Sequence, residues 1–278
     1  SNPLYRLDYT MWSSPVASQN LLAFSPATTT TRFYNYNSST NLYNAEADPS
    51  TTPFTVGKGY LIRMPNTDPT SNYDAGTATL AYPGVFTGVL NNGDINLTGL
   101  TAGQYVAVGN PYPSAISADS FIDANSTGAG SGTLYFWRKT NNLNQSTTPT
   151  TSYATYTKAG PVGLPAGSGT ANEGFTPNGT IAVGQGFITT VPTSGTIAFT
   201  NALRSSSTTA QFLRTKALAE KSRVWLNLSE GTNPVNQMMV AYMDGATTGF
   251  DSGIDGKYIN DAATALTSDI AGEEYVIQ

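Results

Sequence analysis

Cysteine and histidine are both missing from this chain of 278 residues. The first absence excludes a disulfide framework and thiol chemistry, although it does not fix the cellular compartment. The second excludes Ser-His-Asp and Cys-His catalytic arrangements and histidine-ligated zinc sites. Hydrolysis by a carboxylate pair stays open in principle, but none of the 18 acidic residues falls in a catalytic motif. We therefore expect a protein that is not an enzyme and carries no cofactor.

Charge is scarce as well. Only 11% of the residues are Asp, Glu, Lys or Arg, against about a quarter in ordinary domains. The net charge of −5 argues against nucleic acid as a partner, because phosphates require clustered lysine and arginine. No apolar run approaches the roughly 20 residues of a spanning helix, so we expect no membrane-spanning segment.

Thr, Ser, Asn, Gly and Tyr take the place of charge. Thr and Tyr favour strands, while Gly, Asn and Pro favour turns. A hydrophobic content of 39% is enough for a core and too high for a disordered chain. The composition therefore predicts an all-β protein, and the length suits two or three domains.

One phrase occurs twice: FTVGKGYLIRMP at 54–65 and IAVGQGFITTVP at 181–192. Each copy is preceded by a strand that enters a Pro-containing corner and by an aromatic-rich strand, and each is followed by a Gly-Thr strand. This shared order predicts two homologous β-sandwich-like domains, and we place them at 1–100 and 101–204. A linker at 205–222 and a third β domain at 223–278, expected to be incomplete, follow them.

The two glycines of each phrase lie two residues apart. In a strand they share one face and leave a slot against which a neighbouring ring or backbone can lie. The alternative is a phosphate-binding glycine loop, which requires a third glycine or a Gly-Lys-Ser/Thr ending before a helix. Neither copy has these features, so the glycines indicate close contact between strands.

Two helices are expected at most. The segment Ala118–Ala124 follows a rigid NPYP corner, and Ser117 is its candidate N-cap. A second segment, Ala210–Lys221, has fair helical propensity but is polar, so linker and helix remain equally good interpretations.

Several phrases, taken together and in order, resemble a known family. They are MWSSPV, VGKGYLIR, GNPYPSAI, VGQGF, TIAFTNALR, VWLNLS and VAYMDGATTGFDSGIDG. The chain resembles adhesin-like cell-surface proteins of Bacteroidota that are exported by the type 9 secretion system. The resemblance implies an extracellular or cell-surface location and contact with the secretion machinery through a C-terminal sorting domain not present here. It supplies no catalytic residues.

The loop at 244–259 is rich in glycine and aspartate and offers the best metal candidate. Asp251, Asp255 and Gly256 match an EF-hand loop, but its third and twelfth positions do not. A looser calcium site could use Asp244, Asp251 and Asp255. The competing interpretation is a set of tight turns stabilised by aspartate side chains.

Aromatic residues raise a second candidate site. Trp12, Tyr36 and Trp137 could form a flat platform for a neutral glycan. They lie in segments that match between the two repeats, however, which favours structural strands. The main hypothesis is a non-catalytic structural or adhesive segment that contacts other surface domains or copies of itself. The alternative is a carbohydrate-binding module of a secreted enzyme.

Overall fold

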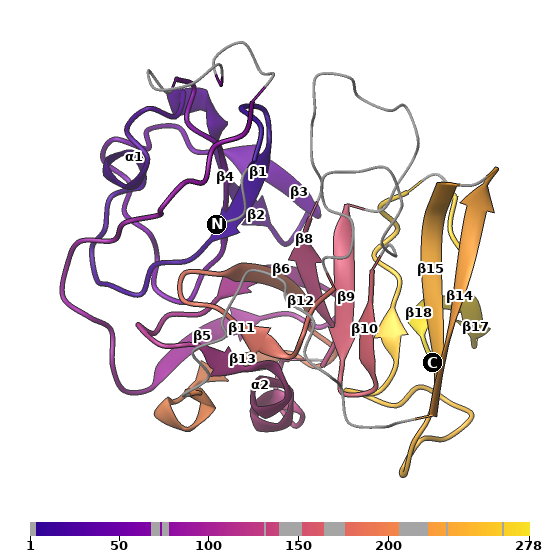
Figure 1. Cartoon of the computed structure of the whole chain (residues 1–278). Helices are drawn as coiled ribbons and strands as arrows, with labels where there is room; N and C mark the ends of the chain where they lie inside the picture. The colour runs from indigo at the N-terminus through magenta and orange to yellow at the C-terminus, as the bar shows by residue number, and fades with distance from the viewer. Residues whose placement is uncertain are drawn as a thin grey trace.

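The computed structural model describes residues 4–67, 73, 78–130, 132–138, 152–163, 176–205, 222–231, 233–262 and 264–278. Strands dominate and lie in several sheets whose pairings are antiparallel except for that of β15 with β18, which confirms the all-β, sandwich-like prediction (Figure 1). Of the predicted linker at 205–222, residues 206–221 lie outside the described residues, and with them the whole of the candidate helix Ala210–Lys221.

The first sheet, called sheet A, belongs to the first repeat. Its strand order is β1-β4-β2-β3, and all neighbours are antiparallel. The elements of this part are β1 (Tyr9–Trp12), α1 (Leu21–Phe24), the 3-10 helix η1 (Thr30–Arg32), β2 (Phe33–Asn37), β3 (Leu42–Ala45) and β4 (Tyr60–Arg63).

Sheet B is the five-stranded sheet of the second repeat, with the order β10-β9-β8-β12-β6. Two further pairs, β11 with β7 and β13 with β5, flank it. The elements are β5 (Ile95–Leu100), β6 (Tyr105–Gly109), β7 (Ile116–Ser117), α2 (Ala118–Asn125), β8 (Leu134–Trp137), β9 (Tyr153–Thr157), β10 (Gly160–Val162), β11 (Thr180–Ile181), β12 (Gly186–Thr190), β13 (Gly195–Phe199) and the 3-10 helix η3 (Asn201–Leu203).

The two repeats share one topology. Read from β1, sheet A runs β1-β4-β2-β3, and sheet B runs β6-β12-β8-β9 before adding β10. The registers also correspond. Trp12 lies opposite Tyr60 in sheet A, and Val108 lies opposite Phe187 in sheet B. The duplicated phrases therefore mark a duplicated supersecondary unit.

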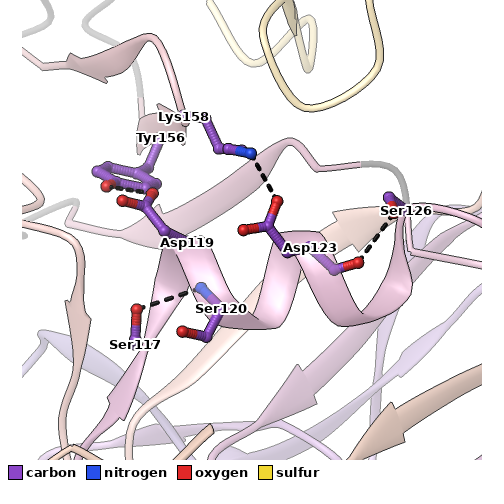
Figure 2. Close-up of polar contacts among 7 residues, drawn as sticks. All are labelled: Ser117, Asp119, Ser120, Asp123, Ser126, Tyr156 and Lys158. Carbon is purple, nitrogen blue, oxygen red and sulfur yellow. Dashed lines mark hydrogen bonds and ion pairs between the residues drawn. The ribbon is translucent and has the colours of Figure 1, made fainter.

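Helix α2 forms where the sequence predicted it. The Ser117 side chain accepts a hydrogen bond from the Ser120 amide at 3.2 Å, which is the expected N-cap (Figure 2). The outer face of the helix is tied to β9 and the residue that follows it: the Tyr156 hydroxyl donates to Asp119 at 2.8 Å, and the Lys158 ammonium pairs with Asp123 (Figure 2). The inner face buries Phe121 and Ile122 in the core of the second repeat.

One boundary differs from the sequence interpretation. Strand β5 was assigned to the first domain, which was expected to end at residue 100, but it pairs with β13 of the second repeat. Its residues Ile95, Leu97 and Leu100 pack against the core of that repeat. In the first repeat the matching contact is a single bridge between Leu4 and Leu80. The pairing of β5 with β13 in the second repeat is thus reduced to one bridge in the first repeat.

Sheets A and B pack face to face through side chains that correspond in the two repeats. Tyr9 and Tyr34 lie 5.9 Å apart between ring centroids, as do their counterparts Tyr105 and Tyr135. We call this shared surface the aromatic interface. Its described members are Tyr9, Met11, Tyr34, Tyr36, Tyr43, Leu61, Tyr105, Ala107, Tyr135, Trp137, Tyr153 and Ile188.

The glycine phrases make reciprocal contacts across this interface. The Gly57 carbonyl accepts a hydrogen bond from the Gly109 amide at 2.9 Å, and the Gly184 carbonyl accepts one from the Ser13 amide at 2.9 Å. Gly57 and Gly184 are the first glycines of the two phrases, and Ser13, directly after β1, corresponds to Gly109, the last residue of β6. Equal contacts in both directions are the signature of a two-fold, isologous interface, here within one chain.

The second glycine of each phrase provides the close approach. A Cβ atom on Gly59 would lie 2.7 Å from the Val108 carbonyl oxygen, and one on Gly186 would lie 2.5 Å from Met11 Cγ. The absence of side chains at these glycines allows the two repeats to come into contact, as the slot interpretation predicted. In the first phrase the strand is shorter than expected, however. It begins at Tyr60, and Gly57, with φ +79°, belongs to the turn before it.

A hydrogen bond joins the hydroxyls of Tyr43 and Tyr153, which are counterparts in the two repeats, at 2.6 Å. We expect Tyr43→Phe and Tyr153→Phe each to destabilise the protein by about 1 kcal/mol and the double variant to cost little more than either. Urea unfolding of the four proteins in this cycle measures the coupling. Tyr36→Phe is the control, because its hydroxyl makes only a long, exposed contact of 3.5 Å. Additive costs would contradict a direct bond.

The aromatic interface also sets an expected response to alkaline pH. Burial raises the pKa of Tyr36 to about 12 and also raises the pKa values of Tyr43, Tyr135 and Tyr153 above their usual value. In the unfolded chain a tyrosine ionises near pH 10, so above that pH the folded state holds more protons than the unfolded state. Stability is therefore full below about pH 10 and falls as the pH rises toward the folded pKa values.

Tyrosinate absorbance and circular dichroism, followed together through an alkaline titration, test this expectation. We expect the interface tyrosines to ionise in the same step in which the sheet signal is lost. Complete tyrosine ionisation near pH 10 with the sheets intact would show that these hydroxyls are accessible and would contradict the buried interface.

The third part of the chain is a sheet with the order β14-β15-β18-β16, in which β17 pairs with β18. It packs beside β10 of sheet B (Figure 1). Val162 of the second repeat shares a core with Met239 and Ile277. The strands are β14 (Ser222–Glu230), β15 (Asn233–Tyr242), β16 (Gly256–Lys257), β17 (Ser268–Ile270) and β18 (Glu273–Ile277).

Candidate functional site: a cleft between the two repeats

A cleft of about 700 Å³ lies where the first repeat meets the second. Strand β2 and the segment 52–60 form one side, and β5 and β6 form the other. Ligand sites commonly occupy such junctions and have volumes of about 300–1,000 Å³. Among the described residues, this cleft is the best candidate for a binding site.

The β2 side of the cleft carries polar side chains in fixed positions. Asn35 is half-buried, and its amide donates to the Glu46 carboxylate at 2.8 Å. This bond orients the carboxylate and leaves the Asn35 carbonyl oxygen as an acceptor. Tyr36, the next residue of β2, adds an aromatic ring. This side therefore combines an amide, an acid and a ring.

The segment 52–60 adds hydroxyl groups and one ammonium group. The Tyr60 hydroxyl donates to Thr55 Oγ1 at 3.0 Å and accepts from the Thr55 amide at 3.2 Å, which fixes the turn. Lys58 is exposed, and its backbone bridges to Val108 of β6. The contact between the repeats thus fixes the backbone position of Lys58 beside the cleft.

Strand alternation places two more polar groups on the β5 side. Ile95 and Leu97 pack against the core, so Asn96 and Thr98 project outward and are exposed. Both line the cleft.

The polarity of the cleft is specific to the first repeat. Asn35 is the counterpart of Phe136, since Tyr34 lies opposite Leu61 just as Tyr135 lies opposite Ile188. Phe136 is buried, and its ring centroid lies 5.7 Å from that of Phe187. At this position the second repeat has a buried phenyl ring, and the first repeat has an amide that lines the cleft.

The chemistry of this lining favours binding over hydrolysis. Glu46 is the one carboxylate among the described lining residues. A glycosidase needs two carboxyl groups facing each other across the scissile bond. That the chain is not an enzyme stays a prediction.

The three aromatic residues that the sequence proposed as a glycan platform do not come together. Trp12 is only 5% exposed and packs against Phe24 in the core of the first repeat, so it cannot contact a ligand, and its assignment was wrong. Trp137 is half-buried in the aromatic interface, with its ring centroid 5.3 Å from that of Tyr153. Tyr36 alone of the three lines the cleft.

The proposed calcium ligands do not converge either. Among the described residues, no group of three or more acidic side chains could hold a metal ion. Asp251 accepts hydrogen bonds from the amide and the hydroxyl of Thr247, and Asp255 accepts one from the Asp251 amide at 2.6 Å. Asp244 is exposed. The alternative of aspartate-stabilised turns describes the loop correctly.

The loop at 244–259 instead connects the third sheet to the second repeat through hydrogen bonds. The carbonyls of Gly253, Ile254 and Asp255 accept hydrogen bonds from the Lys158 amide and from the hydroxyls of Thr157 and Thr133. Gly253 lies so close to Gly132 that a Cβ on the latter would approach it to 2.4 Å. Turns that present carbonyls outward explain the glycine and aspartate content.

Calcium is therefore expected to leave the protein unchanged. We expect no shift in melting temperature at millimolar calcium, because internal N–H groups already engage Asp251 and Asp255. Asp251→Ala should destabilise the protein by about 1 kcal/mol through the loss of turn bonds, with or without calcium. A rise in melting temperature that requires Asp251 would restore the calcium hypothesis.

The sequence interpretation missed Asn35, Glu46, Asn96 and Thr98. They lie on both sides of a repeat junction, so no local motif links them. A position-by-position comparison of the repeats would have shown that Asn35 replaces Phe136, which was the one available signal.

A family model described as "Domain of unknown function (DUF8693)" matches residues 1–278. No curated protein and no solved structure matches. None of the helices in the described ranges has the length and apolarity that crossing a membrane requires.

Proposed function

The chain belongs to this family of unknown function, and from that premise we propose that it is a non-catalytic structural or adhesive segment of a secreted bacterial surface protein. The observation that carries the proposal is the reciprocal interface between the repeats. It joins two β units through corresponding rings, backbone bonds and glycines. Such a junction suits a rigid support for an interaction surface.

The third sheet supports the same role. It shares a core with β10, and three consecutive carbonyls of the loop at 244–259 accept hydrogen bonds from the second repeat. A unit docked in this way has a fixed position relative to the cleft. The low charge and the resemblance to Bacteroidota surface proteins exported by the type 9 secretion system are consistent with exposure outside the cell.

Strand β14 offers a surface for a neighbouring domain or another copy. Val224 and Leu226 point to one face of this outer strand and are 52% and 45% exposed. Tyr242, on the same hairpin, is 72% exposed. Monomeric proteins seldom leave apolar groups clustered in this way without a partner.

Antibody labelling of intact cells of the producing bacterium tests the proposal. We expect antibodies raised against this chain to label unpermeabilised cells, and deletion of the gene to lower attachment of the cells to a surface. Labelling only after lysis would contradict the surface location. If the parent cells are labelled but the deletion leaves their attachment unchanged, the adhesive role is contradicted and the structural role stays.

A further inference from the structure

We infer that the cleft between the repeats binds a segment of a neutral oligosaccharide. The inference rests on the proposed adhesive function and names the ligand of the site. It is drawn from the make-up of the cleft, since the aromatic platform expected from the sequence is not formed.

The lining matches a ligand that is dense in hydroxyl groups. Such a ligand needs donors and acceptors at short intervals, and an amide side chain offers both. Asn35 and Asn96 face the cleft from opposite repeats, and Thr55 and Thr98 add hydroxyls. An apolar ligand would cover the Asn35 carbonyl oxygen and the side chains of Asn96 and Thr98 without offering them hydrogen bonds, which is costly. The volume of about 700 Å³ accommodates a few sugar rings.

The charges in the cleft favour a neutral ligand. Glu46 and Lys58 are the charged residues among its described lining, and they offset each other. An anionic ligand would have to approach Glu46, whose carboxylate is held in place by Asn35. Tyr36, which also lines the cleft, has a hydroxyl that is neutral at physiological pH and can donate a hydrogen bond.

Comparison of the repeats provides an independent argument. Two positions that are purely apolar in the second repeat, Phe136 and Phe187, have polar counterparts in the first, namely Asn35 and Tyr60. Both have partners inside the protein, since the Asn35 amide donates to Glu46 and the Tyr60 hydroxyl donates to Thr55, so the change costs little stability and leaves the Asn35 carbonyl oxygen as an acceptor. An amide at the cleft in place of a buried ring, in one copy of an otherwise matched fold, supports a ligand for that copy.

A glycan array that holds neutral, sialylated and sulfated oligosaccharides tests this inference on the full chain. We expect retention of one or more neutral glycans. Two variants probe the site by different means. Thr98→Arg extends a long side chain from the β5 side, and Asn35→Phe introduces the residue that the second repeat carries. Each should weaken binding at least tenfold in a titration with the retained glycan. Thr101→Arg adds the same charge at an exposed position outside the lining and should bind as the unmodified protein does.

Each outcome decides the inference. Selective loss in the two cleft variants, with their circular dichroism spectra unchanged, supports it. Should Asn35→Phe fail to fold, Thr98→Arg still gives the answer. Retention of acidic glycans only, no retention at all, or binding that Thr98→Arg leaves intact overturns it. Labelling of intact cells is independent of these results, so a failed array and a failed surface location can be told apart.

Discussion

Gly59→Val should destabilise the protein by about 3 kcal/mol or more. A Cβ at this position would lie 2.7 Å from the Val108 carbonyl oxygen and 3.4 Å from Met11 Sδ. Because the first contact is with backbone, relief requires strand β6 of the second repeat to move. Overpacking of this kind typically costs about 1–3 kcal/mol for small additions, and two extra methyl groups on Cβ increase the cost.

Urea unfolding gives the free energy for this variant and its control. Gly195→Ala is the control, since Gly195, like Gly59, has no positive φ but would place its Cβ 3.9 Å from the nearest atom. We expect the control to stay within about 0.5 kcal/mol of the unmodified protein. Equal stability of the two variants would show that the repeats do not approach each other at Gly59.

Tyr135→Ala should cost about 3–5 kcal/mol. The side chain is fully buried in the aromatic interface, and its hydroxyl donates to the Lys257 carbonyl of the third sheet at 2.8 Å. Truncation leaves a large cavity and an orphaned carbonyl, so the loss of burial and the loss of the hydrogen bond act together.

Two further variants separate these contributions in the same unfolding experiment. Tyr135→Phe keeps the ring and removes the hydroxyl, and we expect a loss of about 1 kcal/mol. Tyr34→Ala truncates the counterpart in the first repeat, which is only half-buried, and should cost clearly less than Tyr135→Ala. A Tyr135→Ala variant no worse than Tyr34→Ala would contradict the burial described for this residue.

Much of the fold could be predicted from the sequence because it depends on local signals. Ser117 and the preceding NPYP corner predicted helix α2 nearly to the residue. The duplicated G-x-G phrase predicted strands in close contact, and Gly59 and Gly186 make that contact. Each of these features requires only a few neighbouring residues.

The remaining features depend on which faces of the strands pack together. The alternation of side chains along a strand does not show which face is buried. Trp12 and Tyr36 lie in strands of the same kind, yet one is buried and the other lines the cleft. Strand β5 was separated from β13 because their pairing spans the whole second repeat. The cleft itself joins Asn35 to Asn96, which only the association of the two repeats brings together.

The central claim is that the two repeats form one cooperative unit, and unfolding followed at single tryptophans tests it most directly. The chain has three tryptophans, of which Trp12 lies in the first repeat and Trp137 in the second. Two variants that keep only one of these, with Phe at the other positions, report on each repeat in a urea titration. For each variant, the urea midpoint from tryptophan fluorescence is compared with the midpoint from circular dichroism. We expect the two midpoints to coincide in both variants. A Trp12 transition clearly separated from the Trp137 transition, relative to those references, would mean that the repeats fold independently and would contradict the shared interface.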